Sequence, residues 1–135
     1  MEVLTLREAQ AAVMAILETA AKDGGKPVCA VVVDRTGEPL YLARMDGVPL
    51  RNLHFSMSKA YTSAYMEKDS GEVGELLRES RRTLDWYGNP RLTGIPGGVV
   101  IQKNKFTVGG IAISGRPSEK DLELARIGLA ALLKG

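Results

Sequence analysis

Two apolar segments near the C-terminus are separated by only three polar residues. The segments cover residues 99–102 and 106–114, and Lys103-Asn104-Lys105 lies between them. Apolar segments of strand length joined by so short a polar loop are typical of a β-hairpin, in which two antiparallel strands pair. The chain is therefore expected to contain an antiparallel sheet.

Glycine is concentrated at two places in this hairpin. Gly109-Gly110 lies inside the second segment, and Pro96-Gly97-Gly98 precedes the first. Glycine weakens a strand interior, so it usually marks a bulge or the close approach of another backbone or a ligand. The Pro-Gly pair favours a sharp turn. These patches without side chains therefore suggest either a binding site or a bend in the sheet.

The rest of the chain predicts a second hairpin and several helices. An unbroken apolar run covers residues 28–33 and is followed by a turn and a returning strand over residues 39–45. A β-branched run without alternation favours a strand that is covered on both faces, so helices are expected on both sides of the sheet. Apolar periodicity and capping signals predict helices over residues 5–24, from Asn52 or Leu53 to about Lys68, within residues 69–86, and from Pro117 or Ser118 to the end.

Size and composition describe an ordinary soluble protein. The chain of 135 residues fits one domain covering residues 1–135, with 44% hydrophobic and 25% charged residues. Its net charge of +2 is small and dispersed, so no nucleic-acid partner is expected. A single cysteine excludes an internal disulfide framework. No membrane span and no signal peptide are evident, so the cytoplasm is the expected location.

Three polar residues are candidates for chemistry. His54, the only histidine, lies near the start of a predicted helix and suits an axial ligand, an acid/base group, or a surface or interface histidine. Lys59 suits an anchor for an anion such as a carboxylate, a solvated helix lysine, or a partner of Asp46. Asp46 follows a strand end and suits either a turn or a side chain in the same cleft. His54 shares a helical stripe with Ser58, Tyr61 and Tyr65.

Several short motifs, in one order along nearly the whole chain, resemble the GlcG/HbpS-like family. They are the apolar run 27–34, Met45-Asp46-Gly47, the segment 58–64, Pro96-Gly97-Gly98, the strand 109–115 and the segment 128–132. That family includes small proteins of glycolate-type operons, an extracellular haem-binding regulator, and the C-terminal domain of PduO-type cobalamin adenosyltransferases. One departure is Ala112, where the family usually has glycine.

The resemblance implies a profilin-like layered α/β (α+β) fold, with a five-stranded antiparallel sheet and helices on both faces. The fifth strand would have to come from residues 84–93. The resemblance also implies a homo-oligomer (dimer, tetramer or octamer) and haem or another tetrapyrrole as ligand. The ligand-binding residues expected here are Met45, Asp46, His54, Lys59, Thr62, Pro96, Gly97 and Gly98. His54 is the candidate axial ligand of haem, and no other metal is expected.

Three hypotheses on function follow. The leading one is a small-molecule-binding protein of a catabolic or cofactor-handling operon, without a settled reaction. The second is an enzyme acting on a small oxygenated acid or aldehyde, with Asp46 and Lys59 in its site. The third is a profilin-like protein interaction module, which would need an exposed apolar patch. The sequence does not choose a catalytic residue among these alternatives.

Overall fold

The computed structural model describes residues 2–134 and contains both expected hairpins and all four expected helices. The helices are α1 (Leu6–Lys22), α2 (Leu50–Met66), α3 (Ser70–Ser80) and α4 (Ser118–Lys134), and the strands are β1 (Cys29–Asp34), β2 (Pro39–Arg44), β3 (Gly98–Lys103) and β4 (Phe106–Ser114). Helix α1 begins with the expected capping box, in which the Thr5 hydroxyl accepts a hydrogen bond from the Glu8 amide. Helix α2 begins at Leu50, slightly earlier than its periodicity predicted. None of the described helices is long and apolar enough to span a membrane.

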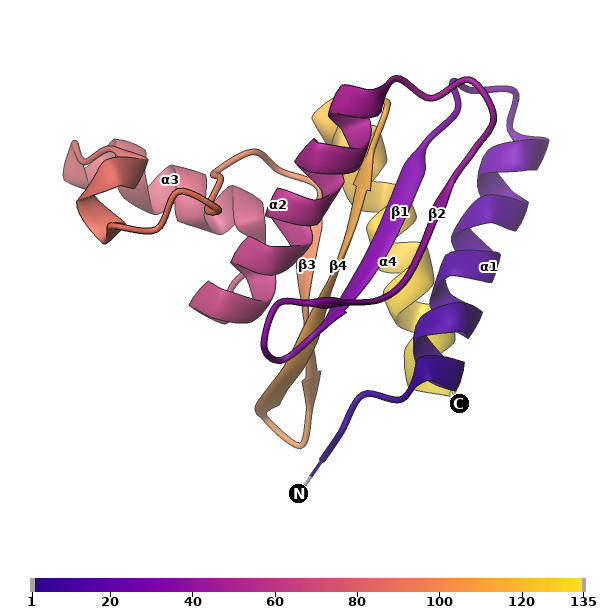
Figure 1. Cartoon of the computed structure of the whole chain (residues 1–135), viewed down its shortest axis with the longest axis horizontal. Helices are drawn as coiled ribbons and strands as arrows, with labels where there is room; N and C mark the ends of the chain where they lie inside the picture. Colours follow the sequence, from indigo (N-terminus) through magenta and orange to yellow (C-terminus); the bar gives the residue numbers. More distant parts are fainter. Residues whose placement is uncertain (1, 135) are drawn as a thin grey trace.

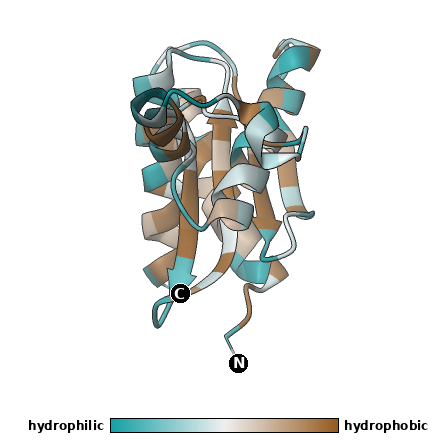
Figure 2. Ribbon diagram, turned by 90° about the vertical axis from the view of Figure 1, so that its left-hand side faces the viewer, coloured by the Kyte–Doolittle hydropathy of each residue, from teal (hydrophilic) through white to brown (hydrophobic). Residues whose placement is uncertain are grey.

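The four strands form one antiparallel sheet in the order β2-β1-β4-β3, with helices on both faces (Figure 1). Helices α1 and α4 pack together on one face, and α2 packs across β1, β4 and β3 on the other. Side chains of β1 alternate between two cores. Ala30 and Val32 face α1 and α4, whereas Val31 and Val33 face α2. Burial on both faces therefore explains the unbroken apolar run, and the strands are largely hydrophobic in Figure 2.

The expected fifth strand is not found among residues 2–134. Within the segment 84–93, Leu84–Tyr87 forms a short 3-10 helix and the remainder is irregular. The outer edge of β3, where a fifth strand would pair, is partly covered by a side chain: the Val100 amide donates to Asp69 Oδ1 at 3.0 Å. Pro90 also lacks the amide that a strand would use, so the segment is poorly suited to pairing.

The glycines of the second hairpin are explained mainly by the close approach of α2. A Cβ atom at Gly98 would lie 2.5 Å from the Lys59 carbonyl oxygen, and one at Gly110 would lie 2.4 Å from the Ala60 carbonyl oxygen. The pairing of β3 with β4 also shifts its register beyond Ile101. Backbone packing and a bulge, both of which are usual reasons for glycine in a strand, are thus present together.

Candidate functional site

The Lys59 side chain is buried between α2 and the start of α4. Its Nζ atom donates to the Ile113 carbonyl oxygen at 2.9 Å and lies 3.3 Å from Asp121 Oδ2. The other carboxylate oxygen of Asp121 accepts from the Arg116 amide at 3.1 Å. Both charged side chains are only 3% exposed. The alternative in which Lys59 is solvated or pairs with Asp46 is therefore wrong, because its partner is Asp121.

Burial changes the pKa of both members of this ion pair. Desolvation lowers the pKa of Lys59 below its usual value, and attraction to Asp121 offsets only part of that effect. Desolvation raises the pKa of Asp121, against the opposing effects of Lys59 and Arg116. The ion pair joins α2 and α4 at the end of β4. A ligand carboxylate would therefore have to compete with Asp121 for the Lys59 ammonium.

The glycine corner before β3 does meet the lysine helix. A Cβ atom at Gly97 would lie 2.8 Å from Lys59 Nζ and 3.0 Å from the Ile113 carbonyl oxygen, and the φ of 125° at this position also favours glycine. Thr62, one turn further along α2, is also buried, and its hydroxyl accepts from the Thr93 amide at 2.9 Å. Pro96, by contrast, is exposed. Lys59, Thr62 and Gly97 therefore join α2 to the segment that precedes β3.

Two other predicted site residues lie elsewhere. Met45 follows β2 and packs against the core between the sheet and helices α1 and α4, the face opposite α2. Its sulfur accepts from the Val28 amide at 3.4 Å. Asp46 is exposed in the turn that follows. The structure thus brings together only part of the predicted set, and a single cleft holding Met45 with Lys59 is not formed.

A surface hollow lies beside the His54 stripe of α2. It has a volume of about 270 Å³ and is lined by His54, Met57, Ser58 and Tyr61 of α2 with Pro90 and Arg91 of the loop before β3. His54 is exposed. The helical stripe recognised in the sequence therefore forms one wall of this hollow, whereas its opposite wall comes from a loop distant in sequence.

A network of polar and aromatic contacts fixes that loop. The Arg91 guanidinium lies 3.9 Å from the centre of the Tyr61 ring and pairs with Glu38 at 2.8 Å. The side-chain amide of Asn89 donates from Nδ2 to the Tyr61 hydroxyl at 2.9 Å. Stacking on an aromatic ring is favourable for a guanidinium and leaves its edge able to bind anions. Imidazole, guanidinium and aromatic ring are therefore held at one opening.

These contacts include residues that sequence reasoning missed. In sequence terms Asp121 is an acidic residue in the first turn of a helix, where such residues are common. Arg91 lies in an irregular loop whose pattern predicts no contact with α2. The Lys59–Asp121 and Tyr61–Arg91 contacts both join segments far apart in the chain. Among the described residues, no group of three or more His, Cys, Asp or Glu side chains is arranged to hold a metal ion.

The fold defines a class of small single-sheet α+β proteins, and comparison with known proteins identifies the family. A family model described as "Haem degrading protein HbpS-like" matches residues 4–130, so the chain belongs to the HbpS-like family. The crystal structure of HbpS is 31% identical with a TM-score of 0.87, covering 98% of this chain and 92% of that one. The resemblance inferred from the motifs is confirmed.

Other relatives carry different names. An uncharacterized 15.0 kDa protein from the dhaT-dhaS intergenic region of Citrobacter freundii is 28% identical, over 93% of this chain and 89% of that protein. The corrinoid adenosyltransferase PduO of Salmonella typhimurium is 24% identical, over 81% of this chain but only 33% of that protein. The structure of a PduOC:heme complex has a TM-score of 0.86 at 22% identity, covering 96% of this chain and 95% of that one, and supports the fold alone.

Proposed function

We propose that this protein binds haem or a closely related tetrapyrrole at the hollow beside His54. The observation that carries the proposal is the position of the only histidine, exposed at an opening that also holds Arg91 and Tyr61. Membership of the HbpS-like family supports the choice of ligand. The proposed binding residues therefore differ from the lysine-centred set expected from the sequence, with His54 common to both.

The side chains suit the parts of a haem. A neutral imidazole is a common axial ligand of haem iron, so His54 would hold the metal. Arg91 would pair with a propionate carboxylate, and Met57 and Tyr61 would contact the planar ring. Bound haem supplies an iron centre capable of ligand binding and electron transfer. The protein's own contribution is to orient the group and to fix its charged edge.

The size of the hollow limits how much of the ligand one chain covers. A volume of about 270 Å³ accommodates an edge of a macrocycle and leaves the remainder facing outward. Large apolar side chains on α2 are exposed nearby in the helix, including Leu50, Phe55 and Tyr65. We therefore propose a homo-oligomer, a dimer, tetramer or octamer, in which a second copy covers the outward part. Light scattering of the purified protein with and without haem measures this assembly.

A haem titration followed in the Soret band tests the binding proposal. We expect a saturable shift at micromolar haem, a changed spectrum for H54A because the axial nitrogen is lost, and weaker binding for R91Q. The matched control R78Q removes the same charge from exposed Arg78 on α3, outside the lining of the hollow, and should bind like the native chain. Identical spectra for the native protein and H54A would reject His54 as the ligand.

The alternative enzyme hypothesis remains a prediction. Its two residues are placed differently in the structure, with Asp46 exposed in a turn and Lys59 buried against Asp121. A thermal-shift screen of small oxygenated acids and aldehydes, repeated with K59A, tests it. The hypothesis fails if none of these compounds stabilises the native chain.

A further inference from the structure

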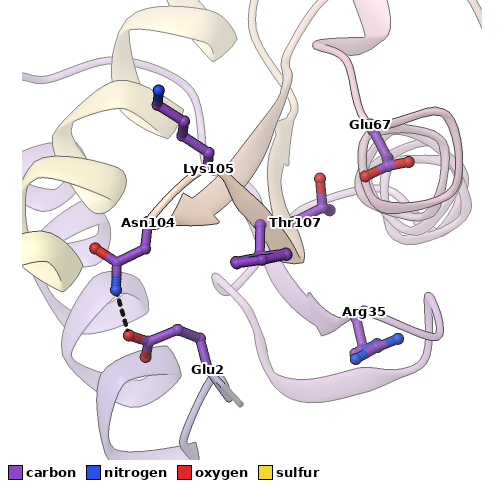
Figure 3. A pocket seen from close by; sticks show the side chains of 7 residues that line it. Glu2, Arg35, Glu67, Asn104, Lys105 and Thr107 are labelled. Atoms are coloured by element: carbon purple, nitrogen blue, oxygen red, sulfur yellow. Dashed lines mark hydrogen bonds between the residues drawn. The ribbon is translucent and has the colours of Figure 1, made fainter.

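A second and larger hollow lies at the opposite end of α2 from Leu50, where the tips of both hairpins come together. Its volume is about 640 Å³, and Figure 3 shows it from close by. We call it the hairpin-tip hollow, and it is lined by Glu2, Arg35, Glu67, Asn104, Lys105, Phe106 and Thr107. None of these residues lines the His54 hollow, so the two openings are distinct.

Local backbone geometry determines which side chains surround this hollow. Asn104 and Lys105 both have positive φ angles, 50° and 70°, as a tight hairpin turn requires. Glu67, which ends α2, also has a left-handed conformation with a φ of 57°. Such backbone conformations are uncommon for residues other than glycine, asparagine and aspartate. The hollow is therefore assembled from three chain reversals, including the turn that carries Arg35 between β1 and β2.

Opposite charges lie on one side of the hairpin-tip hollow. Figure 3 shows Glu67 and Arg35 on one side, Glu2 on the other, and Thr107 between them. Glu2 accepts a hydrogen bond from the side-chain amide of Asn104 at 2.6 Å, whereas the Lys105 side chain points away from Arg35 and Glu67. A ligand entering beside Glu67 therefore meets one cationic and one anionic group.

An apolar ring and a polar atom complete the lining. Phe106 is 69% exposed, although large aromatic side chains gain most from burial. The Thr107 hydroxyl oxygen is buried and has no hydrogen-bond partner among the described residues. A buried polar atom without a hydrogen-bond partner is unfavourable, so a ligand group that supplied such a partner would be favoured. These two features favour a ligand with a flat apolar body and a polar end.

We propose that the hairpin-tip hollow binds a small aromatic carboxylic acid that carries a hydroxyl group. The carboxylate pairs with Arg35, since guanidinium groups bind carboxylates with directed hydrogen bonds. The ring lies against Phe106. The hydroxyl group donates to the Glu67 carboxylate and accepts from Thr107 after a small rotation of that side chain. This site is independent of haem binding.

Titration of the native chain with 4-hydroxybenzoate, followed by amide chemical shifts in NMR, tests the proposal. We expect saturable shifts at Arg35, Phe106 and Thr107 and none at His54 or Arg91. Benzoate lacks the hydroxyl group and 4-hydroxybenzyl alcohol lacks the carboxylate. Each should bind at least about tenfold more weakly, because each loses at least one hydrogen bond to a charged group and one such bond is worth roughly that factor.

Four variants assign the contacts. R35Q should weaken binding of 4-hydroxybenzoate about tenfold, the value of a charged hydrogen bond. E67Q and T107V should each abolish the preference for 4-hydroxybenzoate over benzoate. Valine is chosen at position 107 because it keeps the shape of the threonine side chain. The charge-matched control R78Q should bind normally. Absence of saturable binding at millimolar ligand, shifts centred on His54, or unchanged affinity in R35Q with a native-like spectrum would overturn the proposal.

Discussion

Replacing Lys59 with methionine should cost this protein a large part of its stability. The substitution keeps a long side chain but leaves the buried Asp121 carboxylate without its cation and the Ile113 carbonyl oxygen without its donor. Removal of one member of a buried ion pair typically costs about 3–5 kcal/mol. Because a domain has only about 5–15 kcal/mol of unfolding free energy, K59M is expected to be marginally stable.

The double variant separates the charge effect from lost packing. K59M/D121N removes both charges and keeps a side-chain oxygen for the Arg116 amide, so it should recover more than half of the loss. Urea unfolding followed by circular dichroism measures the free energy of unfolding of the native chain, K59M, D121N and the double variant. Tryptophan fluorescence is less suitable, because Trp86 is 66% exposed. In thermal unfolding, a domain of this size with the loss of stability expected for K59M should have a Tm roughly 10–20 °C below that of the native chain.

The pH dependence of K59M follows from the same pair. Without Lys59, the pKa of Asp121 should rise further, because desolvation then acts with less opposition. A raised pKa in the folded state means that the folded chain binds more protons, so the variant gains stability as the pH falls through that pKa. The difference in unfolding free energy between K59M and the native chain should therefore become smaller at acidic pH.

A loss of unfolding free energy below about 1 kcal/mol in K59M, or strictly additive effects of the two substitutions in the double variant, would refute the assigned role of the pair.

Two further predictions concern packing and acid stability. G110A should lower the free energy of unfolding by about 1–3 kcal/mol, because its Cβ atom would lie 2.4 Å from a carbonyl oxygen of α2. Urea unfolding measures this change, and a free energy of unfolding equal to that of the native chain would contradict the close approach. Hydrogen bonds from Arg116 lower the pKa of Asp23 below its usual 3.8. The stabilisation from Asp23 is therefore lost as the pH falls below 3.8, and the stability gap between D23N and the native chain should close there. A gap independent of pH would exclude this linkage.

Local patterns in the sequence predicted most of the fold. The polar loop at residues 103–105 predicted the second hairpin, and the spacing of Thr5 and Glu8 predicted a helix start, because both depend on neighbouring residues. The unbroken valines of β1 predicted helices on both faces. The prediction of a fifth strand was wrong because the family pattern was assigned to residues 84–93, whose own sequence favours turns.

The site was less predictable because its contacts are long-range. His54 and its helical stripe could be recognised from the sequence, since a helix sets their spacing. The position of Arg91 over Tyr61 depends on how a loop folds back onto α2, and no periodicity encodes this. Similarly, Lys59 resembled a ligand anchor until the structure placed Asp121 beside it. Pairing of distant charged residues is what the sequence alone left open.

A crystal structure of the protein grown with haem tests the central claim most directly. We expect the iron to be bonded to an imidazole nitrogen of His54, with a propionate at Arg91 and the ring against Tyr61. Haem bound beside Lys59 and Gly97, or at the hairpin tips with His54 left free, would contradict it.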